Sequence, residues 1–428
     1  MDGLKRTVKR FLRAVLPWSL LRLIYRWHAA RYIRRLSVPL DPARKTVLVL
    51  NHFYDQDVRA LELANTRFNL VPIDTVTLFR GVKIFFSRDV QGLHVPYATA
   101  DPELVTVYRR ECLLIFDRLD RKFGVGLIVS PSDIFYWVRE FIVVARERDV
   151  RTVVLDKEGT LSPHDFVTEA ARIRVNAPFM SDHIFVWSDR QREFWKRIGV
   201  DDEAITVVGQ ARSDLLYRER RQDLDALFPE KRPIVTLFSY MDDAYIPVEL
   251  VHSEHLTWQK MKTETHDEIG RLAQEHPEYN FVIKTHPQQT DLKQLRRKFA
   301  APNLRVVGGS ALANELLQRS ELIVAFQTTA VIEAMFLNKR VIYTYWDPLV
   351  ERLEDDLLPF HSAAGIAVAR TFEAFRDYCE RFFAGDMTAF EGNAETVRRR
   401  DDFVNEYFYR PDGNVSARFL DTLGRFIK

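Results

Sequence analysis

The chain has 428 residues, more than one compact core accommodates, so we expect two domains. Hydrophobic residues make up 46% and charged residues 29%, a composition that excludes a disordered chain. The net charge of +2 argues against a nucleic-acid-binding protein. Cys112 and Cys379 lie far apart in the sequence, which excludes a disulfide framework or a cysteine zinc site and fits a reducing cytoplasm.

The first 40 residues form a basic segment. Residues 1–36 carry ten Lys/Arg and one acid, Asp2, and apolar residues recur at helical spacing before and after Pro17. We expect basic amphipathic helices that lie on an anionic membrane surface, at the inner face of the plasma membrane; docking on the protein's own core is the alternative. Charges interrupt every apolar run, so neither a signal peptide nor a membrane span of ~20 residues is expected.

Short apolar runs alternate with amphipathic helices over residues 41–216 and again over 234–371, on either side of a charged linker, 217–233. In the first part we expect strands at 46–50, 125–130, 151–155, 183–188 and 205–209, and helices at 57–66, 133–149 and 189–199. In the second we expect strands at 234–239, 280–285, 304–308, 322–326 and 340–345, and helices at 254–275 and from Thr329. Continuous Val/Ile/Leu runs are typical of buried parallel strands. The pattern predicts two Rossmann-like α/β domains with a cleft between them. C-terminal helices follow at 372–428, and the sequence leaves open whether they cross back to the first domain.

The strand at 46–50 is followed by NHFYDQD and not by the glycine-rich turn GxGxxG, which disfavours a dinucleotide-dependent dehydrogenase. Two such domains suit a nucleotide-sugar transferase or epimerase better. Ligands of these sheets bind outside the carboxyl ends of the strands, so the residues just past each strand are candidate site residues. After this first strand they are His52, Asp55 and Asp57.

The strand at 151–155 is followed by DKEGT, with carboxylates at Asp156 and Glu158 and a turn residue at Gly159. A carboxylate at this edge can act as the general base on an acceptor hydroxyl, and glycine lets a ligand approach the backbone. A solvated turn is the structural alternative.

The strand at 280–285 runs into His286 and Pro287, and proline restricts the histidine to an extended backbone. We expect His286 to hydrogen-bond a phosphate oxygen, with Lys284 as a second cation; a structural histidine is the alternative. A second His-Pro pair, at His276, precedes the same strand and serves as an internal control at the far end of the sheet.

The strand at 322–326 is followed by QTTAVIEAM. Thr328 and Thr329 stand where a helix should begin, next to Gln327, and their hydroxyls with the free N–H groups of the first turn can bind an anion. Glu333, one turn further, can reach a ribose hydroxyl. Ordinary helix capping is the alternative.

The acidic-Gly motif, the His-Pro motif and the Thr pair, in this order, resemble those of bacterial sialyltransferases, including capsule polysialyltransferases, and of capsule Kdo transferases. A more distant resemblance, to CDP-glycerol glycerophosphotransferases, rests on VVGQARSD (207–214) and on residues 315–345. Together the resemblances cover about residues 125–345. The sequence departs from these patterns at Lys157, where an acid is expected, and at Arg340, where proline is common.

The resemblance implies a GT-B fold, an acceptor-binding first domain, a nucleotide-binding second domain, a cytidine-nucleotide donor, no essential metal and no cofactor. By position, Glu158 takes the place of the catalytic acid with Asp156 as its neighbour, His286 that of the histidine on the donor phosphate, and Thr328 and Thr329 those of the hydroxyl pair. Lys157 leaves open which carboxylate is the base.

We therefore expect a glycosyltransferase of capsule or cell-envelope synthesis. It would move sialic acid or Kdo from a CMP-sugar to a surface-polysaccharide or lipid-linked acceptor. A CDP-glycerol-type phosphotransferase or a UDP-sugar-dependent GT-B enzyme is the first alternative, and a non-catalytic GT-B-like binding protein is the second.

Overall fold

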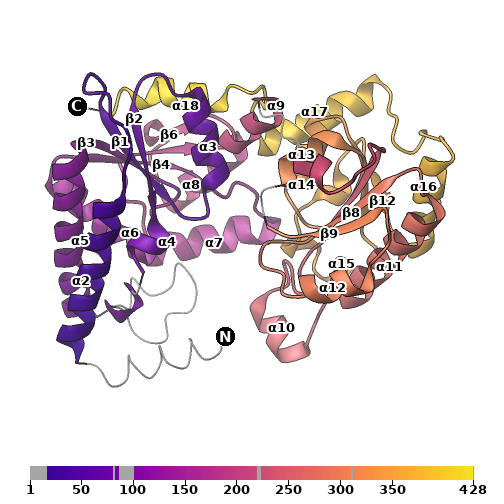
Figure 1. Cartoon of the computed structure of the whole chain (residues 1–428), viewed down its shortest axis with the longest axis horizontal. Coiled ribbons are helices and arrows are strands. Elements are labelled where there is room, and N and C mark those ends of the chain that lie inside the picture. The colour runs from indigo at the N-terminus through magenta and orange to yellow at the C-terminus, as the bar shows by residue number, and fades with distance from the viewer. Residues whose placement is uncertain (1–16, 81, 86–100, 219–222, 310–311, 428) are drawn as a thin grey trace.

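The computed structural model shows two α/β domains, each built on a six-stranded parallel sheet (Figure 1). It describes residues 17–80, 82–85, 101–218, 223–309 and 312–427. The first sheet has the order β2-β1-β3-β4-β5-β6 and contains β1 (Thr46–Asn51), β2 (Asn69–Asp74), β3 (Val125–Ser130), β4 (Arg151–Leu155), β5 (His183–Val186) and β6 (Ile205–Val207). The second has the order β12-β11-β10-β7-β8-β9 and contains β7 (Ile234–Phe238), β8 (Asn280–Lys284), β9 (Leu304–Val307), β10 (Ser320–Ala325), β11 (Arg340–Thr344) and β12 (Ala367–Ala369).

Helices cover both faces of each sheet. The first domain has α2 (Trp18–Arg35), α3 (Asp55–Ala64), α4 (Thr75–Leu78), η1 (Val82–Phe85), α5 (Pro102–Phe123), α6 (Tyr136–Glu147), α7 (Pro163–Asn176), α8 (Asp189–Ile198) and η2 (Asp202–Ala204). The segment between the sheets has η3 (Ala211–Asp214), α9 (Leu215–Arg218) and η4 (Asp223–Ala226). The second domain has α10 (Val248–Glu254), α11 (Gln259–Glu275), α12 (Leu292–Lys298), α13 (Ala313–Arg319), α14 (Ala330–Phe336), α15 (Leu349–Arg352), η5 (Glu354–Asp356), η6 (Phe360–Ser362) and α16 (Phe372–Phe383). The chain ends with α17 (Ala394–Tyr407) and α18 (Val415–Leu423).

The predicted α/β fold is confirmed, with each expected strand present and some ends shifted by one or two residues. Two strands were not expected, β2 and β12, and both lie at sheet edges. Edge strands tolerate breaks in the apolar pattern, such as Pro72 in β2. The helix expected around 254–275 is confirmed as α11, which begins only at Gln259 because His255 adopts a left-handed backbone with φ of 56° and ends the separate helix α10.

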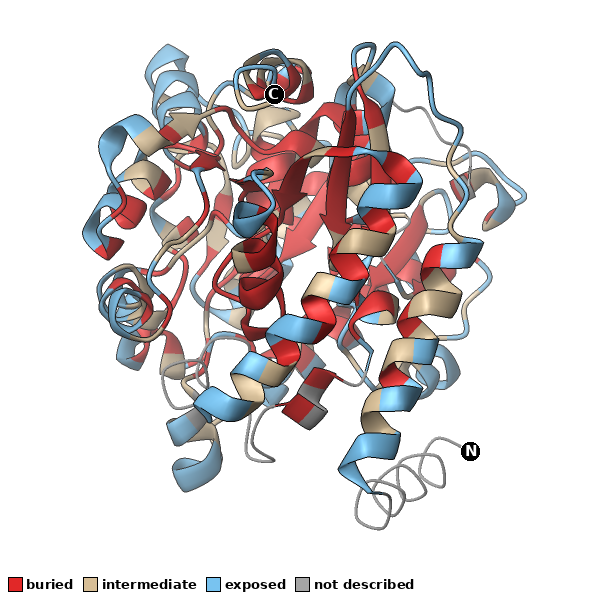
Figure 2. Ribbon diagram, turned by 90° about the vertical axis from the view of Figure 1, so that its left-hand side faces the viewer, coloured by how far each residue is buried: buried red, intermediate tan, exposed pale blue. Residues whose placement is uncertain are grey.

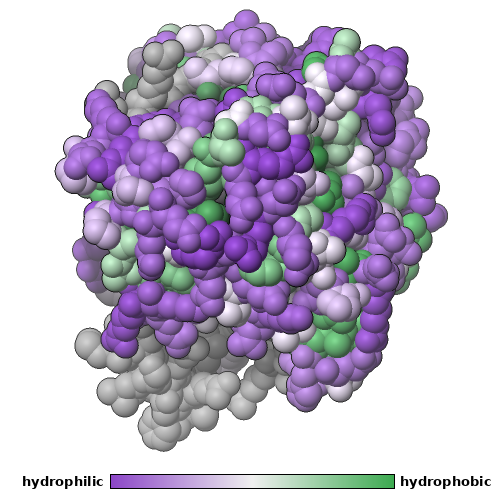
Figure 3. Space-filling model, turned by 90° about the vertical axis from the view of Figure 1, so that its right-hand side faces the viewer, coloured by the Kyte–Doolittle hydropathy of each residue, from purple (hydrophilic) through white to green (hydrophobic). Residues whose placement is uncertain are grey.

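The inner strands bury both of their faces, which explains the continuous apolar runs. In β1, Leu48 and Leu50 belong to one core cluster, and Val47 and Val49 belong to the cluster on the other face. The same division occurs in the second domain. In Figure 2 the strands of the first domain form a buried interior beneath helices whose outer edges are exposed. The outer face of the second domain is mostly hydrophilic, with small, scattered hydrophobic groups (Figure 3).

The strand orders place a topological switch point in each sheet. From β1 the chain moves to β2 at one edge and then to β3 on the other side of β1; β7 and β10 stand in the same relation in the second sheet. Open α/β sheets bind ligands outside the carboxyl ends of strands at such points. The loops after β1, β4, β7, β8 and β10 therefore define where a ligand site is expected.

The C-terminal helices connect the two domains (Figure 1). Helix α17 contacts α14 of the second domain and α8 of the first, and α18 packs against α3 and η3. The start of α18 is held by Asp214, whose carboxylate accepts hydrogen bonds from the N–H groups of Val415 and Ser416 at 3.0 and 2.7 Å. The chain thus returns to the first domain.

Candidate functional site

Two carboxylates follow β4, and they differ sharply in burial. Asp156 is 7% exposed, and its Oδ2 accepts hydrogen bonds from Gln191 Nε2 at 2.7 Å and Trp195 Nε1 at 2.8 Å. Burial raises the pKa of Asp156 to about 7, although the hydrogen bond from Trp195 opposes the rise. The Glu158 side chain is 68% exposed, and its Oε1 lies 3.6 Å from Lys157 Nζ. Glu158 is therefore the carboxylate that a ligand can reach, whereas Asp156 anchors the loop.

Gly159 is required by packing. A Cβ atom at this position would lie 2.1 Å from Cε3 of Trp187. The Trp187 ring is fixed there, because its Nε1 donates a hydrogen bond to the Asp156 carbonyl oxygen at 2.7 Å. The expectation that Gly159 opens room for an acceptor is wrong, since an indole ring occupies that space.

The loop after β1 carries His52 and Asp55. The His52 Nδ1 lies 3.1 Å from Thr75 Oγ1. Its ring contacts three aromatic rings: Phe53, Phe135 and Trp137. Burial, and then the charge of Lys157, lower the pKa of His52 to about 4, so the imidazole is neutral at pH 7. Asp55 is exposed and accepts a hydrogen bond from Asn51 Nδ2 at 2.6 Å. Both side chains remain candidates for the acceptor side.

Arg212 in η3 joins acidic groups of both domains. Asp57 in α3 is 3% exposed; its Oδ1 accepts a hydrogen bond from the Arg212 N–H at 3.1 Å, and its Oδ2 lies 3.8 Å from Arg212 Nη1. Glu333 in α14 lies 3.9 Å from Arg212 Nε. Burial raises the pKa of both carboxyls, to about 6 for Asp57, and Arg212 opposes the rise. Asp57 is therefore enclosed between the domains and is not placed to contact an acceptor, contrary to expectation.

The loop after β8 determines which nitrogen of the neutral His286 ring carries the proton. The Gln288 N–H donates a hydrogen bond to His286 Nδ1 at 3.2 Å, so the neutral ring carries its proton on Nε2. The His286 N–H donates to Gln289 Oε1 at 2.6 Å. His286 as a whole is exposed although its ring is partly buried, and its Nε2–H group is the donor it can offer to an acceptor such as a phosphate oxygen.

Lys284 and His276 differ from His286 in their surroundings. Lys284 is 4% exposed, and its Nζ donates a hydrogen bond to the Thr285 carbonyl oxygen at 2.9 Å. Burial lowers the pKa of Lys284 to about 8. The control residue, His276, lies before β8 and stacks on Phe383 with ring centroids 3.8 Å apart. His276 is thus at the amino end of the strand, where no other candidate site residue lies.

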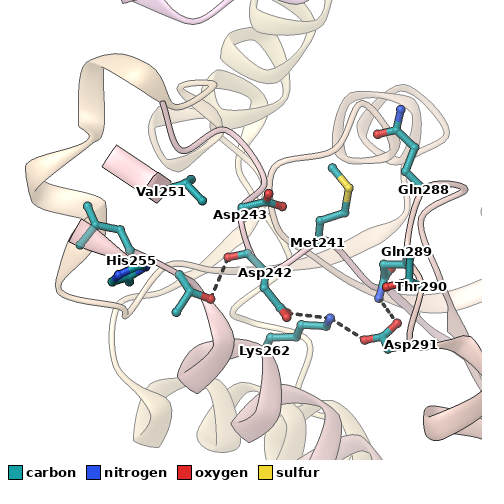
Figure 4. A pocket seen from close by; sticks show the side chains of 12 residues that line it. Met241, Asp242, Asp243, Val251, His255, Lys262, Gln288, Gln289, Thr290 and Asp291 are labelled. Carbon is teal, nitrogen blue, oxygen red and sulfur yellow. Dashed lines mark hydrogen bonds and ion pairs between the residues drawn. The ribbon is translucent and has the colours of Figure 1, made fainter. Parts of the chain in front are cut away.

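A cavity of about 540 Å³ lies beside His286, between the loops that follow β7 and β8 (Figure 4). Its lining includes Met241, Asp242, His255, Lys262, Gln289 and Asp291. Lys262 Nζ lies 2.8 Å from Asp242 Oδ1 and 2.7 Å from Asp291 Oδ2, and Gln289 Nε2 donates to Asp291 Oδ1 at 3.2 Å. Because Gln289 also holds the His286 backbone, this network positions the histidine.

Gln327, after β10, is used by the fold. It is 4% exposed, and its Nε2 donates hydrogen bonds to the Tyr343 hydroxyl at 2.6 Å and the Leu358 carbonyl oxygen at 3.0 Å. Its Oε1 accepts a hydrogen bond from the Leu358 N–H at 2.8 Å. The expectation that Gln327 contacts the donor is wrong, because both ends of its amide are bonded inside the second domain.

The two threonines behave differently. Thr328 Oγ1 accepts a hydrogen bond from the Ala330 N–H at 3.3 Å, so the capping alternative applies to it. Thr329 occupies the N-cap position of α14, and its hydroxyl makes no hydrogen bond to any residue that the structure describes. Both side chains are partly exposed. Thr329 is therefore the freer hydroxyl for a ligand.

Glu158 and His286 come from different domains and lie within electrostatic reach of each other. Burial and the charge of Lys284 lower the pKa of His286, and the Glu158 carboxylate opposes this. Burial raises the pKa of Tyr245, which follows β7, and Glu158 adds to the rise. The loops that follow β4, β7 and β8 therefore lie near enough for their charges to interact, and they carry the carboxylate and the imidazole that the sequence analysis singled out.

Sequence reasoning missed the residues that hold Asp156, namely Trp187, Gln191 and Trp195. The spacing of four residues between Gln191 and Trp195 was a usable signal, because it places two hydrogen-bond donors on one face of α8, whereas Trp187 lies before that helix. It also missed Tyr245, which lies in an irregular loop with no periodic pattern. Within the described ranges, no three His, Cys, Asp or Glu side chains gather as metal ligands would.

Comparisons with known proteins support the fold. No protein-family model matches the sequence. A segment of 97 residues is 28% identical to Protein FixF of Sinorhizobium fredii, and the match spans 23% of this chain and about a quarter, 24%, of that relative's length.

Similar solved structures cover nearly the whole chain. The UDP-GlcNAc 2-epimerase of Neisseria meningitidis, bound to UDP-GlcNAc, has a TM-score of 0.52 at 13% identity, over 89% of this chain and 100% of that one. The UDP-GlcNAc 2-epimerase of Methanocaldococcus jannaschii has a TM-score of 0.52 at 13% identity, over 89% of this chain and 99% of that one. The S. aureus MnaA structure with UDP has a TM-score of 0.50 at 12% identity, over 89% of this chain and 96% of that one. At these identities the likeness shows the fold, a GT-B arrangement of two Rossmann-like domains. The resemblance to sialyltransferases and Kdo transferases stays a prediction.

Proposed function

We propose that this protein is a metal-independent GT-B glycosyltransferase that takes a sugar from a nucleotide-activated donor and transfers it to an acceptor hydroxyl. The observation that carries the proposal is the electrostatic interaction between the exposed Glu158 of the first domain and His286 of the second. A base and a phosphate-binding donor on facing strand ends are the two groups that such a transfer needs.

The chemistry follows from the protonation of these groups. Glu158 is the base that removes the proton from the acceptor hydroxyl as the hydroxyl oxygen attacks the anomeric carbon. The bond between that carbon and the phosphate oxygen breaks, and negative charge grows on the leaving nucleotide. The Nε2–H of His286 and the Thr329 hydroxyl donate hydrogen bonds to this phosphate. Glu333, one turn after Thr329, is the candidate for a ribose hydroxyl; it is 9% exposed, and Arg212 Nε lies 3.9 Å from its carboxylate.

For the donor we favour a UDP-sugar. The similar structures include enzymes bound to UDP and to UDP-GlcNAc, which makes a uridine nucleotide the first candidate for this fold. A CMP-linked acidic sugar is the second candidate, supported by the order of the acidic-Gly, His-Pro and Thr-pair motifs. Lys157 weakens that second candidate, because the motif carries an acid there.

A thermal-shift panel of UDP, CMP, CDP and GDP tests the nucleotide. We expect UDP to raise the unfolding temperature most; a larger shift with CMP selects the acidic-sugar donor, and with CDP the phosphotransferase. Incubation of the matching nucleotide-sugar, followed by NMR, then separates transfer or donor hydrolysis from epimerisation of the sugar. No shift with any nucleotide and no turnover would contradict the proposal and favour a non-catalytic binding protein.

A further inference from the structure

Helix α2 has a face that docks on the first domain. Tyr25, Ala29 and Ile33, spaced by four residues, are buried in the core of that domain. On the same side Arg26 makes two hydrogen bonds to the buried Glu111, at 2.6 and 2.7 Å, and Arg22 makes a third at 3.0 Å. Core docking, the alternative considered for the basic segment, therefore holds for this face.

The opposite face of α2 is apolar and exposed. Leu23, Ile24 and Trp27 are 60%, 47% and 57% exposed, and Leu20 is 39% exposed. An α-helix turns by about 100° per residue, so their spacing of three and four residues places them on one face, opposite the buried set. A helix with apolar residues on both sides has two partners, and the first domain accounts for only one.

Basic residues continue this exposed face toward the C-terminal end of the helix. The Arg31 guanidinium carbon lies 5.1 Å from the centroid of the Trp27 ring, and Arg34 and Arg35 in the last turn are exposed. Arg22 and Arg26 share the single carboxylate of Glu111, whereas no acid is present on α2 itself. The outer face of α2, defined by Leu20, Leu23, Ile24, Trp27, Arg31 and Arg34, is thus both apolar and cationic.

We propose that the outer face of α2 docks on an anionic lipid surface. Apolar side chains with a tryptophan enter the boundary between headgroups and acyl chains, and arginines pair with lipid phosphates. None of the helices in the described part of the chain has the length and hydrophobicity to span a bilayer, so the contact lies along the surface. Elsewhere the exposed large apolar side chains are mostly isolated, such as Val167 and Val175 on α7.

The contacts of α2 place this surface at the same end of the first sheet as the candidate site. His28 Nε2 lies 3.0 Å from the Thr77 carbonyl oxygen, and the Tyr32 hydroxyl accepts a hydrogen bond from the Asp74 N–H at 2.8 Å. Asp74 ends β2, so α2 flanks the carboxyl end of the first sheet, the end that carries Glu158. If the proposed function holds, an acceptor anchored in the membrane has a short path to the site.

Sedimentation of the full chain with lipid vesicles tests the proposal. Vesicles of phosphatidylcholine with about 30% phosphatidylglycerol supply the negative surface. We expect the triple variant Leu23→Asp, Ile24→Asp, Trp27→Asp to bind at least about tenfold more weakly than the wild type, since each change removes an apolar side chain from the lipid boundary. Val167→Asp with Val175→Asp is the matched control, because it places charges on exposed valines of another helix and should bind like the wild type.

Two further measurements test the contribution of the arginines and keep the lipid proposal distinct from the proposed function. Arg31→Glu with Arg34→Glu should weaken binding to anionic vesicles while binding to pure phosphatidylcholine stays low throughout. Unchanged vesicle binding in the triple variant would overturn the lipid proposal. So would analytical ultracentrifugation showing that the wild type is a dimer and that the triple variant loses the dimer and not vesicle binding. The UDP thermal shift of the wild type is measured in parallel: its absence counts against the proposed function, and vesicle binding counts only for or against the lipid surface.

Discussion

The loops after β4 and β10 occupy corresponding places in the two domains, and in each the first polar residue after the strand is buried. Asp156 and Gln327 both give their polar atoms to neighbours inside their own domain. The residues two positions further on, Glu158 and Thr329, keep a carboxylate and a hydroxyl available to a ligand. At a strand end, therefore, distance from the strand separates the residue that supports the loop from the residue that meets the ligand.

The strongest test of this comparison is to replace each carboxylate of the β4 loop, in turn, by its uncharged amide. We expect Glu158→Gln to lose roughly 10²–10⁴ of the transfer rate, the usual contribution of a general base, while nucleotide binding is kept. Asp156→Asn should lose only a few-fold, because Asp156 acts through the loop that carries Glu158. Donor turnover and nucleotide titration on both variants decide between them. Full activity in Glu158→Gln would remove Glu158 from the mechanism.

The two His-Pro pairs extend the comparison to opposite ends of one strand. We expect His286→Ala to lower transfer by about 10²–10³ and to weaken nucleotide binding, because a hydrogen-bond donor to the leaving phosphate is lost. His276→Ala removes a stacking contact with Phe383 far from the site and should leave both properties unchanged. Steady-state kinetics on the pair measure this, and equal losses would contradict the assignment of His286.

Much of this arrangement was predictable, because it rests on local pattern. The strands read as apolar runs, and the rule that ligands meet strand carboxyl ends selected Glu158, His286 and Thr329. What could not be predicted depends on tertiary contacts. Nothing in the sequence next to Asp57 shows that Arg212, 155 positions later, encloses it. Likewise, the two-faced burial of α2 depends on Glu111 and the core of the first domain.

In the β10 loop, Gln327 and Thr329 can be compared through the stability of the fold. Gln327→Leu leaves the Tyr343 hydroxyl and both backbone polar groups of Leu358 without their buried partner, and should cost about 1–3 kcal/mol of unfolding free energy. Thr329→Val keeps the shape of a partly exposed side chain and should leave stability nearly unchanged while weakening nucleotide binding several-fold. Chemical denaturation and nucleotide titration of both variants check this. Equal destabilisation would show that Thr329 also belongs to the fold.

The smallest expected effect concerns the pH dependence of stability at Asp156. Burial raises its pKa to about 7 in the folded protein, so between about pH 4 and pH 7 the folded state holds a proton that the unfolded state has released. The contribution of Asp156 to stability is therefore fully present below pH 4 and is lost as the pH rises to 7.

Other buried groups also titrate in this range, so the comparison of wild type with Asp156→Asn isolates this carboxyl. The buried His183 and His266, each with a pKa lowered to about 4, have the opposite sign but are common to both proteins. We expect the stability advantage of the wild type over the variant to shrink from pH 5 to pH 8, measured by urea unfolding at each pH. A constant difference would mean that Asp156 is ionised throughout, and that the donors Gln191 and Trp195 outweigh its burial.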